Sequence, residues 1–226
     1  MARRNVRASR EKKRPEFWKR VLKPEAERDE RRGWAEGVKG RRRVDEDRRG
    51  AWKYFRTPLN AIEKRLGVDI SGLARALAEK RGGKSQVKVL DLGCGNGIAL
   101  AQLKKEFGAS VKTVGVVEER TPKETYSGVD RLLVGNMLGL QPRESYDVIF
   151  SHMGAVHHTP LQTTAVERVI GWLKPGGTAA LEMRHAFAEG SPVVQEVLTV
   201  LAQNGIKDWK YKGDVLVFKK PAPRMP

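Results

Sequence analysis

The feature of this sequence most typical of ligand chemistry is a run with three glycines, Leu90-Asp91-Leu92-Gly93-Cys94-Gly95-Asn96-Gly97. It follows an apolar stretch and precedes residues with helical spacing. Glycine is needed where a tight strand-to-helix turn must also let a ligand approach the backbone closely. The dinucleotide fingerprint G-x-G-x-x-G is not met, because Ile98 stands where its last glycine or alanine would be. The loop, with the acid Asp91 ahead of it, predicts a binding site of another type.

A second group of reactive side chains follows the apolar run Tyr146–Ser151, where histidines stand at positions 152, 157 and 158. A neutral imidazole can take a proton from an oxygen or nitrogen atom. We expect His152 to be a catalytic base because it directly follows the apolar run. His157 is instead suited to filling the core or rim, and His158 to beginning a helix. The histidines lack the spacing of metal ligands on one helical turn, so no metal site is predicted.

These residues belong to a regular alternation of strands and helices that begins near Gln86. We predict strands over 87–92, 111–117, 131–134, 146–151, 178–183, 206–212 and 215–219, and helices over 98–107, 161–173 and 191–204. Such alternation implies a parallel sheet with helices on both faces. The Gly213-Asp214 turn implies that the last two strands form an antiparallel hairpin. The predicted fold is a doubly wound α/β domain with a mostly parallel, seven-stranded sheet over residues 86–220, followed by a tail over 221–226.

Two segments precede this domain. Residues 51–85 have apolar residues at helical spacing, which predicts two short helices that cover an edge of the domain, the first ending at Gly67. Residues 1–50 are rich in Arg, Lys and Glu, with few apolar anchors. We predict that they form a basic, largely disordered extension with a short helix around Pro24–Arg32.

Positive charge is concentrated in these leading segments. Of a formal net charge of +17, residues 1–50 contribute 19 basic and 10 acidic side chains, residues 51–85 contribute 8 and 3, and residues 86–226 contribute 17 and 14. Clustered Lys and Arg displace counterions from phosphates, which favours RNA as a partner. A solvated tail that only aids solubility is the alternative. Aromatic residues such as Phe17 and Trp34 are suited either to stacking on bases or to holding the extension on its own domain.

Composition also bears on the compartment. No apolar run reaches the ~18 residues of a membrane-spanning helix. The residues after Met1 are charged, unlike a secretory signal. Cys94 is the single cysteine, which excludes an intramolecular disulfide and a Cys-based zinc site. We expect a cytoplasmic protein without a membrane partner, or one of an organellar matrix.

The segment Val87–Gly97 resembles motif I of the class I S-adenosylmethionine-dependent methyltransferases, and the similarity extends over about residues 86–220. The resemblance implies S-adenosyl-L-methionine as the cofactor, lying on the glycine turn. It implies cofactor-binding roles for Asp91, Gly93, Gly95, Gly97, Glu118, Asn136, Met137 and Ser151.

Two of these positions depart from the family pattern. The ribose-binding acid usually stands where this chain has Val117, so Glu118 is expected to bind the ribose, with Glu119 as the second choice. Asn136 stands where an Asp usually meets the adenine amino group, and its carbonyl can still accept that hydrogen bond. Met137 would pack on the adenine ring.

Several classes of methyl acceptor are disfavoured because the sequence lacks the motifs that their methyltransferases carry. Methylation of pyrimidine C5 uses a cysteine, and the only one lies inside the glycine loop. The Asn/Asp-Pro-Pro-aromatic run of adenine amine methyltransferases is absent after Ser151, and His152 and Glu182 replace residues of the Lys-Asp-Lys-Glu set of one ribose 2′-O branch. We expect a methyltransferase of RNA, with ribosomal RNA or a ribosome-associated molecule as substrate. A protein or small-molecule methyltransferase and a non-catalytic ribosome assembly factor are the alternatives.

Overall fold

The computed structural model describes residues 57–118, 126, 128–183 and 191–223. All of them belong to one compact unit, Phe55–Pro226. The predictions for the extension at residues 1–50 and for Glu119 lie outside the described residues. No helix in the described ranges is long and apolar enough to cross a membrane.

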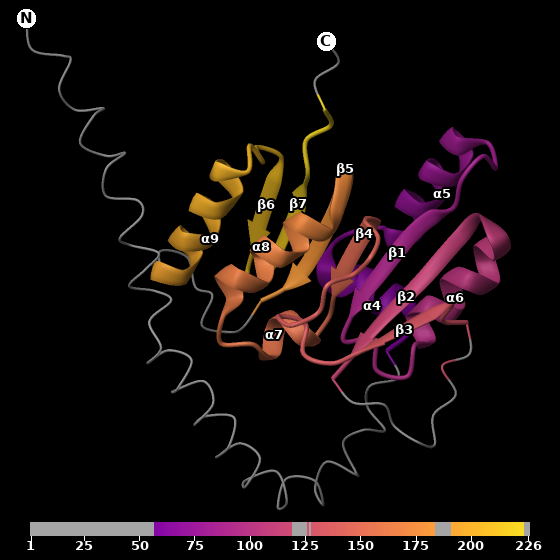
Figure 1. Cartoon of the computed structure of the whole chain (residues 1–226), viewed down its shortest axis with the longest axis horizontal. Helices are drawn as coiled ribbons and strands as arrows, with labels where there is room; N and C mark the ends of the chain where they lie inside the picture. Colours follow the sequence, from indigo (N-terminus) through magenta and orange to yellow (C-terminus); the bar gives the residue numbers. More distant parts are fainter. Residues whose placement is uncertain (1–56, 119–125, 127, 184–190, 224–226) are drawn as a thin grey trace, which may run out of the picture. The chain divides into compact units, whose positions relative to one another are not determined.

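A seven-stranded sheet forms the centre of the described unit (Figure 1). Its strands are β1 (Val87–Leu92), β2 (Val111–Val117), β3 (Arg131–Val134), β4 (Tyr146–Ser151), β5 (Leu173–Glu182), β6 (Trp209–Lys212) and β7 (Val215–Lys219). Their order is β3-β2-β1-β4-β5-β7-β6. The first five strands run parallel, and β7 is antiparallel to β5 and β6. The predicted fold is therefore confirmed, and its order reverses between β1 and β4, where such sheets bind ligands.

Two strands begin elsewhere than predicted. Strand β5 begins at Leu173, which pairs with Tyr146, while Thr178 pairs with Val148. The residues between Leu173 and Thr178 therefore form an irregularity within β5, where the sequence predicted a turn ahead of the strand. Strand β6 begins at Trp209 and is shorter than the predicted 206–212.

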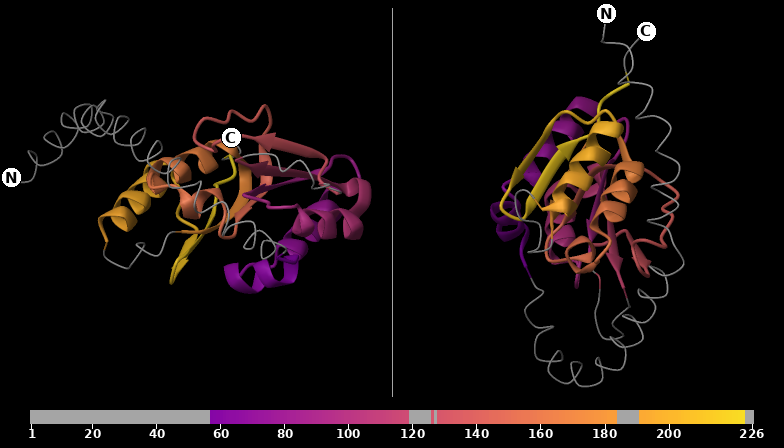
Figure 2. Two further views of the ribbon diagram at one scale, coloured as in Figure 1. Left: turned by 90° about the horizontal axis from the view of Figure 1, so that it is seen from below. Right: turned by 90° about the vertical axis from the view of Figure 1, so that its left-hand side faces the viewer.

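In the described ranges, helices cover both faces of the sheet (Figures 1 and 2). On one face lie α4 (Leu59–Leu66), α5 (Ile70–Arg81) and α6 (Ile98–Phe107), followed by a short 3-10 helix, η2 (Gly108–Ser110), and on the other lie α7 (Ala155–His158), α8 (Gln162–Trp172) and α9 (Pro192–Gln203). The alternation of side chains along each strand fills both cores. In β1, Val87 and Val89 join the core under α4–α6, whereas Leu90 and Leu92 join the core under α7–α9.

Helices α4 and α5 lie on a face of the sheet. The sequence had predicted that they cover its edge, and that prediction is wrong. Leu59, Ile62 and Leu66, one stripe of α4, are buried in the same core as Val89. Because that stripe is apolar enough to enter the core, packing on the face removes more of it from water than an edge would. Helix α4 ends at Gly67, as predicted, with φ 64° in the left-handed region.

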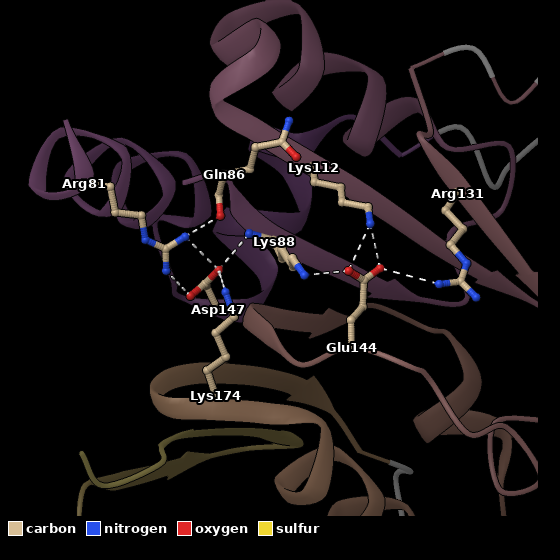
Figure 3. Close-up of polar contacts among 8 residues, drawn as sticks. All are labelled: Arg81, Gln86, Lys88, Lys112, Arg131, Glu144, Asp147 and Lys174. Carbon is tan, nitrogen blue, oxygen red and sulfur yellow. Dashed lines mark hydrogen bonds and ion pairs between the residues drawn. The ribbon is translucent and has the colours of Figure 1, made fainter. Parts of the chain in front are cut away.

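An ion-pair network joins the amino ends of the parallel strands (Figure 3). The buried Asp147 carboxylate of β4 accepts hydrogen bonds from the Arg81 guanidinium, from Lys174 Nζ at 2.8 Å and from the Lys88 amide at 2.7 Å. Nearby Glu144 forms ion pairs with three further cationic groups, Lys88 Nζ at 2.7 Å, Lys112 Nζ at 2.9 Å and Arg131 Nη1 at 3.6 Å. The network holds α5 and the strands in register at the edge opposite the glycine loop.

Replacing Asp147 with Asn should destabilise the fold by about 2 kcal/mol at pH 7, because the buried donors lose their charged acceptor. Burial alone would raise the pKa of Asp147, but the hydrogen bonds from Arg81 and Lys174 outweigh it and lower the pKa. The stabilising effect is therefore present above about pH 4 and is lost as the pH falls through the lowered pKa. Urea unfolding of both proteins at pH 7 and pH 3 should show a difference that shrinks in acid.

The matched control is Asp208→Asn, which removes the same charge from an exposed position. It should leave the free energy of unfolding within about 0.5 kcal/mol of the wild-type value. Equal effects of the two substitutions would contradict a structural role for the Asp147 network.

Candidate active site at the carboxyl ends of the strands

The glycine loop turns sharply at the end of β1. The amides of Gly93 and Cys94 both donate to the Val116 carbonyl of β2 at 3.0 Å. Gly93, Gly95 and Gly97 have φ values of 95°, 53° and 78°, all in the left-handed region that side chains disfavour. The predicted need for glycine at these positions is thus a matter of backbone conformation.

The same loop touches the turn after β4 backbone to backbone. A Cβ on Gly93 would lie 2.5 Å from Gly154 Cα, and a Cβ on Gly154 would lie 1.9 Å from the Leu92 carbonyl oxygen. The buried Ser151 hydroxyl donates to that same oxygen at 2.9 Å. Ser151, predicted as a cofactor-binding residue, therefore ties β4 to β1 directly beneath the loop. The sequence analysis did not single out Gly154.

Asp91 is a buried acid without compensation. It is 3% exposed, and no hydrogen bond or ion pair to its carboxylate is found within the described part of the chain. Burial raises its pKa to about 8. In the same loop Asn96 Oδ1 is also buried and has no hydrogen-bond partner among the described residues. A buried carboxyl group and an amide oxygen without a partner among the described residues fit a cationic ligand with N–H donors, as the ammonium group of S-adenosylmethionine provides.

The other residues predicted to bind the cofactor come to the same edge of the sheet. Glu118 is exposed directly after β2, and the Gly135 amide after β3 donates to the Val117 carbonyl at 2.9 Å. Asn136 is exposed, and its Oδ1 accepts from the Leu138 amide at 2.9 Å, which shapes the turn. Met137 is buried in the core under α7–α9. The contacts of these residues with ribose and adenine remain predictions.

His152 leaves the end of β4 beside a buried carboxylate. Its Nδ1 lies 2.7 Å from Glu182 Oε2, and that oxygen also accepts from the Met153 amide at 2.9 Å. The other oxygen, Glu182 Oε1, accepts from Arg65 Nε at 3.1 Å and Nη2 at 2.8 Å. Burial would raise the pKa of Glu182, but the hydrogen bonds from Arg65, Met153 and His152 lower it. A histidine oriented by an ionised carboxylate is a geometry that supports proton transfer.

The sequence did not indicate that Glu182 and Arg65 contact His152. Arg65 lies in α4, 117 residues from Glu182, and no local pattern relates the two. One signal was available, because Glu182 is an acid inside a run otherwise expected to be buried.

The two other histidines near β4 do not join this group. His157 is buried, and its Nδ1 lies 3.0 Å from the Met183 carbonyl, which agrees with a core residue. His158 is the last residue of α7. The prediction that it begins a helix is wrong, because α7 already begins at Ala155, directly after the tight turn at Gly154.

Comparison with known proteins gives one family match and a series of distant structural likenesses. Residues 89–177 match the model of a family described as a methyltransferase domain. DesVI of Streptomyces venezuelae is 18% identical, with 67% of this chain and 92% of that chain covered and a TM-score of 0.45. CalS10 of Micromonospora echinaspora, an amino pentose methyltransferase solved with S-adenosylmethionine bound, is 17% identical over 73% of this chain and 97% of that chain, with a TM-score of 0.43.

Replacing Gly154 with Ala should disrupt the site, because the added methyl group would overlap the Leu92 carbonyl. We expect a loss of about 2 kcal/mol in stability and of at least tenfold in affinity for S-adenosylmethionine, since the glycine loop must move. Thermal unfolding and isothermal titration measure the two effects.

The matched control is Gly171→Ala in α8, where an added Cβ meets nothing within 4 Å. Alanine there should stabilise the helix slightly and leave cofactor affinity unchanged. Unchanged affinity in Gly154→Ala as well would show that the close approach of the two loops does not matter for binding.

The pKa of Asp91 predicts a pH dependence in the ligand-free protein. With an ordinary pKa near 3.8 in the unfolded chain and about 8 in the folded one, the folded state keeps a proton that the unfolded state releases. Stability should therefore fall from about pH 4 to pH 8 and level off above. Asp91→Asn should remove this part of the fall, as the difference in thermal unfolding between pH 5 and pH 8 would show.

The same substitution should weaken binding of S-adenosylmethionine, because the amide has no charge to offer a cation. Wild-type affinity should rise with pH toward 8 and release a proton on binding, which titration in buffers of different ionisation enthalpy detects. A variant that binds as tightly as the wild type, with the same pH dependence, would rule out Asp91 as the partner of the cation.

Proposed function

We propose that the chain is a class I S-adenosylmethionine-dependent methyltransferase that transfers a methyl group to an oxygen or nitrogen atom of RNA, with ribosomal RNA as the substrate. The match of residues 89–177 to a methyltransferase domain supports the transfer of a methyl group. The bound cofactor supplies the methyl group on a positively charged sulfur atom. Asp91 and Asn96 offer their buried acceptors to its cationic end, and the backbone of Gly93 and Gly95 leaves room for its approach. Glu118 and Asn136 stand at the neighbouring strand ends for its ribose and adenine.

His152 is the group that we propose removes the acceptor's proton. Its Nδ1 faces Glu182, which leaves Nε2 on the far side of the ring as the free basic nitrogen. The acceptor atom gives its proton to Nε2 and forms the new bond to the methyl carbon, while the electron pair of the carbon–sulfur bond stays on sulfur. S-adenosylmethionine would supply the methyl group as a cationic donor, and the protonated imidazole would be stabilised by the ionised carboxylate of Glu182.

The choice of RNA rests on one observation, the uneven distribution of charge. The first 85 residues hold 27 basic and 13 acidic side chains, while the remaining 141 residues are close to neutral. An enzyme with a small-molecule substrate has no need of such a segment, whereas a phosphate backbone binds it through counterion release. The neutral domain then contains the chemistry, and the basic segment brings the acceptor to it.

The test is methyl transfer from tritiated S-adenosylmethionine to ribosomal RNA transcribed in vitro, which carries no methyl groups of its own. We expect label in RNA and a steep loss of RNA affinity between 50 and 200 mM salt. The triple substitution Arg41→Gln, Arg42→Gln and Arg43→Gln should weaken RNA binding and reduce the salt dependence by up to about three phosphate contacts.

The control removes the same charge from the domain, with Lys210→Gln, Lys212→Gln and Lys219→Gln at exposed positions of the β6–β7 hairpin. It should leave RNA affinity nearly unchanged. If ribosomal proteins take the label and RNA does not, or if the two triple variants bind RNA equally, the RNA part of the proposal is wrong while methyl transfer stands.

A further inference from the structure

The carboxylate of Glu182 is buried and contacts polar groups from several parts of the chain. It is 2% exposed at the last position of β5. Its Oε1 accepts two hydrogen bonds from Arg65, and its Oε2 accepts from the Met153 amide and lies 2.7 Å from His152 Nδ1. These partners come from two separate parts of the chain, Arg65 of α4 and the His152–Met153 pair after β4. A single buried charge is thus the point at which two elements far apart in sequence are joined to the end of β5.

Arg65 is itself held from a further direction. Its Nη2 donates to Asp214 Oδ2 at 2.6 Å, in the turn between β6 and β7. The Asp214 carbonyl accepts from the Met183 amide, also at 2.6 Å, one residue beyond Glu182. The guanidinium therefore lies between two carboxylates, which fixes its plane and aims Nε and Nη2 at Glu182 Oε1.

The backbone at Met153 shows that this arrangement imposes a conformation. Met153 has φ 43°, and it is the one non-glycine residue with a positive φ in the described part of the chain. Its amide is held by Glu182 Oε2, and its side chain is 43% exposed. Strain of this kind persists where surrounding contacts enforce it, and it is typical of functional sites.

We propose that Glu182 and Arg65 are the positioning residues of the acceptor site, and that they set the tautomer of His152 and the direction in which it leaves β4. This inference rests on the proposed role of His152 as the base. With Oε1 occupied by Arg65, Oε2 is left to accept the Nδ1–H of His152, so Nε2 carries the lone pair. Arg65 also keeps Glu182 ionised, so that the carboxylate stabilises the imidazolium without taking its proton.

The substitution Glu182→Gln gives a specific expectation, because an amide has one acceptor oxygen in place of two. Arg65 carries a full charge and will claim that oxygen, which turns the amide N–H₂ toward His152 Nδ1. The ring must then accept at Nδ1 and move its proton to Nε2, where it blocks the base. We expect kcat to fall by about a hundredfold or more, with little change in the affinity for S-adenosylmethionine.

Removing Arg65 from that variant should reverse the effect. In the double variant Glu182→Gln with Arg65→Met, no guanidinium draws the amide oxygen away. The oxygen can then rotate back to accept from His152 Nδ1 and from the Met153 amide, in the place that Glu182 Oε2 has in the wild type. We expect the original tautomer to return, together with part of kcat. A merely structural role predicts the opposite, because the second substitution would add to the damage of the first. Arg75→Met is the matched control, since Arg75 forms an exposed pair with Glu106 on the neighbouring helices.

The tautomer can be measured without any acceptor, by nitrogen NMR of the full chain labelled in its four histidines. His152→Gln assigns the signal. We expect a proton on Nδ1 in the wild type and in Arg75→Met, a proton on Nε2 in Glu182→Gln, and recovery in the double variant. A wild-type ring protonated on Nε2, or a tautomer that Glu182→Gln does not change, would overturn the inference.

The transfer assay separates this inference from the proposed function. If His152→Gln abolishes methyl transfer while Glu182→Gln does not, His152 is the base and the positioning pair is refuted. If neither substitution affects transfer, the proposed role of His152 is wrong and the inference falls with it. If the wild type fails to bind S-adenosylmethionine, the proposed function itself fails, while the NMR result still reports on the pair.

Discussion

The backbone of the glycine loop lies directly against the backbone of the turn after β4, with no room for a side chain on either. Gly93 and Gly154 meet at this point, and the Leu92 carbonyl lies between them, held by Ser151. The contact occurs where the strand order reverses, so it fixes the distance between the two halves of the site. Asp91 stands shortly before Gly93 in one segment, and His152 stands shortly before Gly154 in the other. The residues proposed to bind the cofactor and the proposed base are therefore placed relative to each other by main chain, which cannot change rotamer.

The buried carboxylates of the domain fall into two kinds, and the difference separates structure from function. Asp147 and Glu182 are surrounded by donors, which lower the pKa of each despite burial. Asp91 has burial but no partner in the described part of the chain, and its pKa rises to about 8. Basic residues outnumber acidic ones in this chain. A shortage of cations therefore does not explain why Asp147 and Glu182 have basic partners and Asp91 has none among the described residues. A buried acid of this kind is typical of a binding site, which agrees with the proposal that Asp91 meets the positive charge of the cofactor.

The sequence predicted most of the sheet because periodicity is local. Alternating apolar residues and the spacing of glycines gave the bounds of β1, β2, β3, β4 and β7 as the structure has them. The start of β5 was missed because pairing with Tyr146 extends the strand through residues that favour a turn. The face covered by α4 could not be predicted, since it depends on where its apolar stripe finds a partner. Glu182 and Arg65 were missed for the same reason, because only the tertiary fold brings them to His152.

The burial of Asp91 also bears on how long the folded protein persists. A ligand that binds only the folded state shifts the folding equilibrium by an amount that grows with its concentration. The empty protein must either protonate a buried acid or keep an unpaired one, so it opens more often and meets proteases more often than the occupied protein. Binding of the methyl donor should thereby slow both the unfolding and the proteolysis of the protein.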